Sequence, residues 1–144
     1  MSAEKLLQNT RLEVSPETFF LISLSFEDWL RLLESPELSP RGSAPFMILR
    51  DAHEVTLLID EIDYGTIRHA IRNAKIESGF RLVTFNIELG WNVVGYFALI
   101  SKILAEAEIP LGAVSAFSRD HLLIKQEHLA KALKVLGEYV KELC

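Results

Sequence analysis

The stretch GAVSAFSRDHLLIK, residues 112–125, consists of two apolar runs that flank a polar corner. Short apolar runs with branched side chains are typical of β-strands, and polar residues between them are typical of a tight connection. We therefore predict a β-hairpin with GAVSAFS and HLLIK as its arms. The corner at Arg119, Asp120 and His121 admits three interpretations: a turn fixed by Asp120, a ligand-binding carboxylate, or a catalytic Asp–His pair.

The composition is that of an ordinary folded protein. The chain has 144 residues, 49% hydrophobic and 24% charged, which is enough to bury a core and too apolar for long disorder. The formal net charge of -5 disfavours nucleic acid as a partner, because clustered Lys and Arg supply most of the affinity for phosphate backbones.

Cysteine usage and hydropathy bear on the compartment. The only cysteine, Cys144, cannot form an internal disulfide and is typical of a reducing compartment. The apolar stretch 93–104 is interrupted by Lys102 and is too short to span a bilayer, and the N-terminus lacks the pattern of a secretory signal. We expect a cytoplasmic protein with no membrane partner.

The first half of the chain predicts the order β-α-β-β-α. TFFLISLS (18–25) has the pattern of a strand, and FEDWLRLLES (26–35) that of an amphipathic helix. FMILRD and EVTLLID predict a second hairpin, and Asp63 is expected to cap a helix from Tyr64 to about Glu77 that ends at Ser78 and Gly79. The inward face of the first helix is expected to hold Phe26, Trp29, Leu30 and Leu33.

The second half repeats this order. FRLVTFNIE (80–88) predicts a strand, and Asn92 is expected to cap a helix that runs to about Ala107. The hairpin of residues 112–125 follows. A last amphipathic helix is expected to present Leu129, Ala132, Leu133, Leu136, Val140 and Leu143 to the core.

Two copies of one order indicate an α+β fold of two ferredoxin-like βαββα units in tandem, each an antiparallel sheet with helices on one face. We place the units at residues 10–78 and 79–144. Such a unit normally has a fourth strand after its second helix, and the C-terminal unit has almost no chain left to form one. The alternation in TRLEV (10–14) predicts that this segment supplies it.

Catalytic and metal-binding motifs are absent. The sequence contains no G-x-G-x-x-G, G-x-x-x-x-G-K-S/T, G-x-S-x-G or C-x-x-C pattern, which argues against a common cofactor or an activated nucleophile. The four histidines lack metal-ligand spacing. The carboxylates of Asp60, Glu61 and Asp63 are explained by helix capping. We predict no enzyme activity, no cofactor and no metal.

One turn could bind an anion. Glu88, Trp91 and Asn92 surround the strand-to-helix turn of the second half, where backbone N–H groups and a positive helix end favour a carboxylate. An ordinary helix cap, with Trp91 as a packing residue, explains the same pattern, and both interpretations stay open.

The segment LGWNVVGYFALISKILAEAEIPLGAVSAFSRDHLLIKQEHLAKAL resembles the ACT domains of the CASTOR-like group, small tandem ACT proteins that include arginine sensors. The strand, the turn with Gly95, the phrase AEAEIPLGAVS and the aspartate before LLIK carry the resemblance. The first half matches more loosely, through VSPETFFLISLS, FMILRD and EVTLLID. In this group, small ligands such as amino acids lie between the turn of one ACT unit and the hairpin corner of another.

The resemblance implies a set of ligand-binding residues. On the turn side these are Asn92, Val94 and Gly95, and on the corner Ala116, Phe117, Ser118 and Asp120. Relatives often read S-T-x-x-T-D at the corner, whereas this chain has Ala116 in place of a hydroxyl residue and Arg119 beside Asp120. Arg119 could neutralise that carboxylate and weaken any preference for a cationic ligand.

The resemblance implies a regulatory protein without catalytic activity that binds a small amino acid or related metabolite. We expect it to form a homodimer and to act on a protein partner. The alternative is an ACT-mediated assembly module with no ligand. A small enzyme that uses Asp120 and His121 is a third interpretation.

Overall fold

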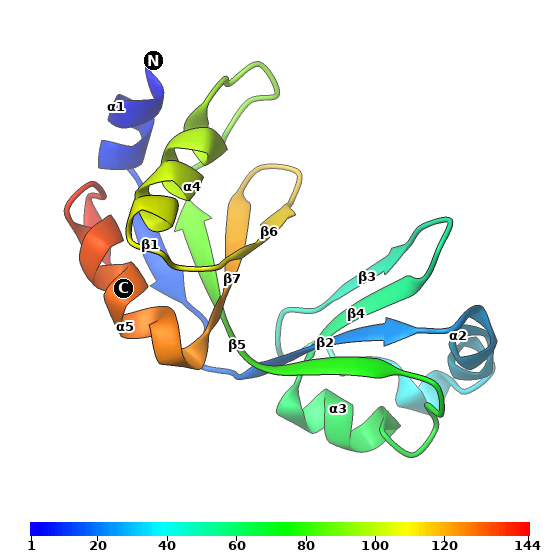
Figure 1. Ribbon diagram of the computed structural model, residues 1–144. Coiled ribbons are helices and arrows are strands. Elements are labelled where there is room, and N and C mark those ends of the chain that lie inside the picture. Colours follow the sequence, from blue (N-terminus) through cyan, green and yellow to red (C-terminus); the bar gives the residue numbers. More distant parts are fainter. The chain divides into compact units, whose positions relative to one another are not determined.

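The computed structural model describes residues 1–144, which form two compact units. Unit 1 comprises residues 1–16 and 81–144, and unit 2 comprises residues 17–80. The long strand β5 (Lys75–Asn86) belongs to both units, with the boundary between Phe80 and Arg81 (Figure 1). None of the helices has the length and apolar character needed to cross a membrane.

Unit 2 has the strand order of a ferredoxin-like sheet. Its antiparallel strands follow the order β3-β4-β2-β5. Alternate residues of β2 and β4, among them Ile22, Leu24 and Leu57, form the core with Ile67 of the second helix. The elements before β5 are β2 (Phe19–Leu24), α2 (Phe26–Leu33), the 3₁₀ helix η1 (Pro36–Leu38), β3 (Met47–Arg50), β4 (Val55–Asp60) and α3 (Glu61–Ile67).

The second helix of unit 2 is shorter than the sequence predicts. It ends at Ile67, and Asp60 rather than Asp63 caps it by accepting the Asp63 N–H. The expected helix to Glu77 is wrong because residues from Lys75 onward pair with β2. The predicted breaker Gly79 instead lies inside β5, with a φ of 79° at an irregularity in that pairing.

Helix α2 confirms half of the expected inward face, because Phe26 and Trp29 pack against the core of unit 2. Leu30 and Leu33 are exposed, whereas Asp28 is completely buried. The Asp28 carboxylate pairs with Arg31 and accepts the backbone N–H groups of Arg72 and Asn73 at 2.9 and 3.0 Å. A buried carboxylate with these partners joins α2 to the segment between α3 and β5, which an apolar pattern cannot predict.

Unit 1 repeats the β-α-β-β-α order and adds pieces from both ends of the chain. Its strand order is β6-β7-β5-β1-β8. The pairs β5–β1 and β6–β7 are antiparallel and the pair β1–β8 is parallel, so this sheet is mixed. Its elements besides β5 are α1 (Ala3–Gln8), β1 (Arg11–Val14), α4 (Tyr96–Glu106), β6 (Gly112–Ser115), β7 (Asp120–Lys125), α5 (Gln126–Gly137) and β8 (Glu142–Leu143).

The fourth-strand position of unit 1 is filled from the N-terminus. The expected strand there is β1, whose Arg11 pairs with Asn86 and whose Val14 pairs with Val83. The expectation that the last helix extends to Leu143 is wrong, because α5 ends at Gly137. Leu143 instead belongs to strand β8 and pairs with Leu12 of β1. Helix α1 has no counterpart in the sequence-based prediction.

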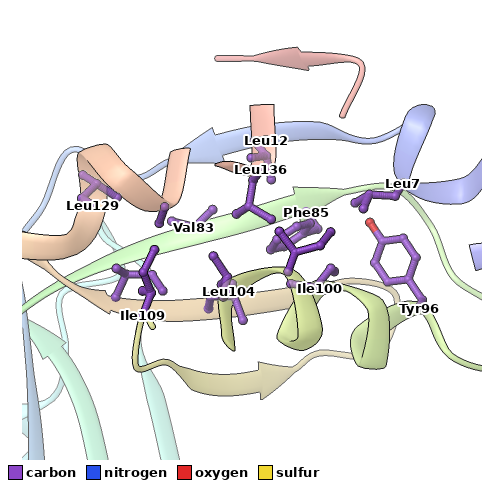
Figure 2. Close-up of a cluster of buried hydrophobic side chains, with 14 residues drawn as sticks. Leu7, Leu12, Val83, Phe85, Tyr96, Ile100, Leu104, Ile109, Leu129 and Leu136 are labelled. Carbon is purple, nitrogen blue, oxygen red and sulfur yellow. The ribbon is translucent and has the colours of Figure 1, made fainter. Parts of the chain in front are cut away.

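The core of unit 1 lies between helices and sheet, as Figure 2 shows. Phe85 of β5 and Leu12 of β1 are completely buried and pack with Ile100 of α4 and Leu136 of α5. Leu7 brings α1 into the same cluster. The protein therefore has an α+β, ferredoxin-like architecture, and α4 begins beside the buried residue Thr10 of the N-terminal segment.

Candidate functional site

Unit 1 contains a solvent-accessible pocket of about 870 Å³. Two segments line it, residues 89–98 from the β5–α4 turn and the start of α4, and residues 115–120 from the β6–β7 corner. The Leu89 N–H donates to the Ser118 carbonyl at 2.8 Å and joins the two segments. Sheet topology places them side by side because β7 pairs with β5.

The start of α4 is not capped by a side chain. The residue before the helix is Gly95, with a φ of 85°, a left-handed conformation that suits glycine. Asn92 is therefore not the helix cap that the sequence analysis expects. It lies in an exposed turn in which the Val93 N–H donates to the Gly90 carbonyl at 3.2 Å. The first N–H groups of α4 consequently have no side-chain acceptor.

The corner places Asp120 at the first position of β7. Its Oδ1 accepts the Ser115 hydroxyl at 2.8 Å across the register pair Ser115–Asp120. The Ala116 N–H donates to the Arg119 carbonyl at 2.9 Å and closes the corner. Asp120 is partly exposed and lines the pocket.

Arg119 does not pair with its neighbour Asp120. Its Nε donates to Asn86 Oδ1 at 2.8 Å, and a terminal guanidinium nitrogen lies 3.7 Å from Glu88 Oε1. The guanidinium is thus directed toward the end of β5. The expected neutralisation of Asp120 by Arg119 has no ion pair to support it.

His121 does not line the pocket. Its Nδ1 lies 2.9 Å from Thr84 Oγ1. Burial lowers the pKa of His121, an effect that Asp120 opposes and Arg119 reinforces. No group of three or more His, Cys, Asp or Glu side chains is arranged to hold a metal ion.

Five of the seven residues implied by the resemblance line the pocket. They are Gly95, Ala116, Phe117, Ser118 and Asp120. The other two, Asn92 and Val94, lie in the same turn but outside the lining, and Val94 is almost fully exposed. Turn and corner both belong to unit 1, so the pocket lies within one unit rather than between two.

Sequence reasoning missed Tyr96 as a pocket residue. Tyr96 is buried, and its hydroxyl lies 2.7 Å from Thr10 Oγ1. Figure 2 shows its oxygen directed toward Leu7. Burial raises the pKa of Tyr96 to about 12, so the phenol stays protonated at neutral pH. The sequence feature that could have indicated this role is a tyrosine that directly follows a glycine at the start of an apolar helix.

Three large apolar side chains next to the pocket are exposed. Trp91 and Phe117 are fully exposed and Val94 nearly so. Exposed apolar clusters of this kind commonly mark interaction sites. We refer to these three residues as the apolar rim.

Comparison with known proteins supports the fold. Residues 75–138 match the family model of the ACT domain. No protein with a curated description matches the chain by sequence.

Solved structures resemble nearly the whole chain. A protein from Agobacterium tumefaciens is 18% identical, with a TM-score of 0.68 over 94% of this chain and 92% of that one. A Vibrio cholerae protein, described as of unknown function and a possible transport protein, is 24% identical with a TM-score of 0.68 over 96% and 95%. The regulatory subunit of aspartate kinase from Thermus thermophilus, ligand-free, is 9% identical with a TM-score of 0.62 over 92% and 98%. At these identities the likeness concerns the fold.

Proposed function

We propose that the protein is a non-catalytic regulator that binds a small amino acid or related metabolite in the pocket of unit 1. The main observation in support is that the start of α4, which no side chain caps, and the Asp120 carboxylate line the same cavity. The ACT domain match and the likeness to a regulatory subunit of aspartate kinase support the regulatory class. The site of action is the cytoplasm, where the ligand controls binding to a protein partner.

The two sides of the pocket suit the two charged groups of an amino acid. The first N–H groups of α4 and the positive end of its dipole favour the α-carboxylate. Asp120 accepts a charge-assisted hydrogen bond from the ammonium group or from a cationic side chain. Since Arg119 is directed to Asn86 and Glu88, no ion pair with Arg119 competes with the ligand for Asp120. Ala116, Phe117 and Ser118 line the same wall as Asp120.

The wider architecture of the proposal is a tandem ACT protein of the CASTOR-like type. Each unit has the β-α-β-β-α order, and the order β3-β4-β2-β5 in unit 2 corresponds to β6-β7-β5-β1 in unit 1. The N-terminal ACT-like unit is assigned to residues 10–78 and the C-terminal one to 79–144. In this assignment, residues 10–14 supply a strand to the sheet of the C-terminal unit.

Thermal unfolding in the presence of single amino acids tests the proposal. A ligand that binds only the folded state raises the midpoint of unfolding in proportion to the logarithm of its concentration. We expect at least one amino acid to raise the midpoint in the native protein and to lose that effect in Asp120→Ala. A panel in which no amino acid changes the midpoint contradicts the proposal.

The apolar rim favours a second candidate function, an assembly module without ligand. Trp91, Val94 and Phe117 present apolar surface that a second copy of the chain could cover. On this account the protein is a homodimer in light scattering, and Trp91→Ser with Phe117→Ser makes it a monomer. Trp91 and Phe117 also line the pocket, so Val94→Ser, which lies outside the lining, is the variant that should leave ligand binding intact under the first proposal. A monomer mass for the native protein across the micromolar range argues against assembly.

A further inference from the structure

A second cavity opens on unit 2 and shares no lining residue with the first pocket. It measures about 260 Å³. Its walls come from α2, β3, β4 and α3, with Trp29, Leu32, Leu57, Ile59 and Ile67 among its apolar lining residues. Protein interiors contain few voids larger than a water molecule. An apolar cavity of roughly 150 Å³ already accommodates benzene, so this one has room for a small organic molecule.

The segment after α2 forms one side of this cavity. Pro36, Leu38, Ser39 and Pro40 line it, and they belong to the connection between α2 and β3. The next residue, Arg41, fastens this connection to the start of α3. Its Nε donates to Asp63 Oδ1 at 2.9 Å, and a terminal nitrogen reaches Asp60 Oδ2 at 3.4 Å. The connection is therefore held over the cavity by one guanidinium.

The cavity has a single charged lining residue. Asp63 is buried and lines it. Its Oδ1 accepts from Arg41, whereas its Oδ2 takes part in none of the hydrogen bonds of this cluster. Two carboxylates face one guanidinium here, which leaves an excess negative charge. A ligand head group that donates hydrogen bonds or carries positive charge suits this end, and an anionic one does not.

We propose that unit 2 binds a small branched-aliphatic or aromatic compound with an amine or hydroxyl head, its apolar body among Trp29, Leu57 and Ile67 and its head on Asp63. This site is independent of the amino-acid pocket proposed for unit 1. It differs in chemistry too, since its lining residues offer hydrocarbon, the hydroxyl of Ser39 and one carboxylate, but no cation to pair with an α-carboxylate.

Trp29 provides a local readout. The chain has two tryptophans, and the other, Trp91, is fully exposed. In a Trp91→Phe background, titration with 3-methylbutylamine, 3-methylbutan-1-ol and 3-methylbutanoate reports on the cavity through Trp29 fluorescence. We expect saturable changes for the amine and the alcohol below about 10 mM, an affinity range reasonable for so few atoms. The carboxylate should give none.

Matched variants locate the binding. Ile48→Phe and Leu33→Phe each enlarge an exposed side chain that lines the cavity without adding a second tryptophan, so both should fold and lose binding by about tenfold or more. Asp63→Asn should remove the preference for amine over alcohol. Arg41→Gln should speed dissociation, whereas Arg68→Gln, the same change at an exposed position of unit 2, should not. Asp120→Ala, which impairs the unit 1 pocket, should leave these titrations unchanged.

Three results overturn the inference. One is the absence of any saturable fluorescence change with the amine and the alcohol. Another is binding that both Ile48→Phe and Leu33→Phe leave intact in proteins folded by circular dichroism. The third is loss of binding on Asp120→Ala, which would assign the compounds to unit 1. Failure of the amino-acid panel alone contradicts only the proposed function.

Discussion

The hydroxyl groups of Thr10 and Tyr96 lie 2.7 Å apart in unit 1. Thr10 also donates to the Leu6 carbonyl at 2.7 Å, so its single proton is used and Tyr96 is the donor in the pair. Tyr96 is the first residue of α4 and lines the unit 1 pocket. One buried bond thus joins the wall of the pocket to the segment between α1 and β1.

Replacing this tyrosine should weaken unit 1 without removing its ring. Tyr96→Phe keeps the aromatic contact with Phe85 and removes the hydrogen bond to Thr10. We expect the free energy of unfolding to fall by about 0.5–1.5 kcal/mol, measured by urea denaturation. Tyr139→Phe is the control, since Tyr139 is exposed, and it should change stability little. Equal effects from the two variants would contradict the buried bond.

The same residue should make stability depend on alkaline pH. Burial raises the pKa of Tyr96 from 10.0 to about 12, so the folded protein holds the phenol proton more tightly than the unfolded chain. This contribution is complete below pH 10 and is lost as the pH rises toward 12. The stability advantage of the native protein over Tyr96→Phe should therefore shrink between about pH 10 and pH 12. A constant difference across this range would argue against a buried phenol.

The buried carboxylate of Asp28 should contribute more to stability than the exposed carboxylate of Glu27, although both contact Arg31. Asp28→Ala leaves the N–H groups of Arg72 and Asn73 without their acceptor and removes one of the two carboxylates that contact Arg31. We expect a loss of about 2–4 kcal/mol in the free energy of unfolding. Glu27 also contacts Arg31 but is largely exposed, so Glu27→Ala should cost less than about 0.5 kcal/mol. Chemical denaturation of both variants makes the comparison.

Gly95 should resist substitution for a reason of backbone geometry alone. Its φ is 85°, and an added Cβ would meet no atom within 4 Å. Gly95→Ala should therefore cost about 1–2 kcal/mol through the left-handed conformation, and Gly95→Asn should cost less because asparagine tolerates it. Gly65 lies inside α3, where an added Cβ also meets nothing, so Gly65→Ala should stabilise the protein by about 0.5–1 kcal/mol. Thermal unfolding of the three variants tests this contrast.

The sequence predicted best those elements whose spacing of apolar residues fits a strand and not a helix. The hairpin of β6 and β7 and the N-terminal strand β1 appear close to their expected bounds. The missed elements depend on distant partners. Residues 75–79 contain ordinary helix formers, yet pairing with β2 makes them part of β5, and tertiary contacts routinely override such local preferences.

The candidate site was predicted more completely at the corner than at the turn. The corner follows from a hairpin whose register fixes Asp120 opposite Ser115. On the turn, the residue type of Asn92 predicts a helix cap, but the residue before the helix is Gly95 and no side chain caps it. The partners of Arg119 and Tyr96 could not be foreseen, because Asn86 and Thr10 reach them only through strand pairing in the folded unit.

Calorimetric titration of Asp120→Ala with the amino acid selected by thermal unfolding tests the central claim most directly. A charge-assisted hydrogen bond contributes about 1.5–3 kcal/mol, so we predict a loss of affinity of roughly 10- to 100-fold with the fold retained by circular dichroism. His121→Ala should bind nearly as the native protein does, since His121 faces Thr84 and not the pocket. Unchanged affinity in Asp120→Ala would contradict a ligand-binding role for the corner, and an equal loss in both variants would favour an Asp–His pair instead.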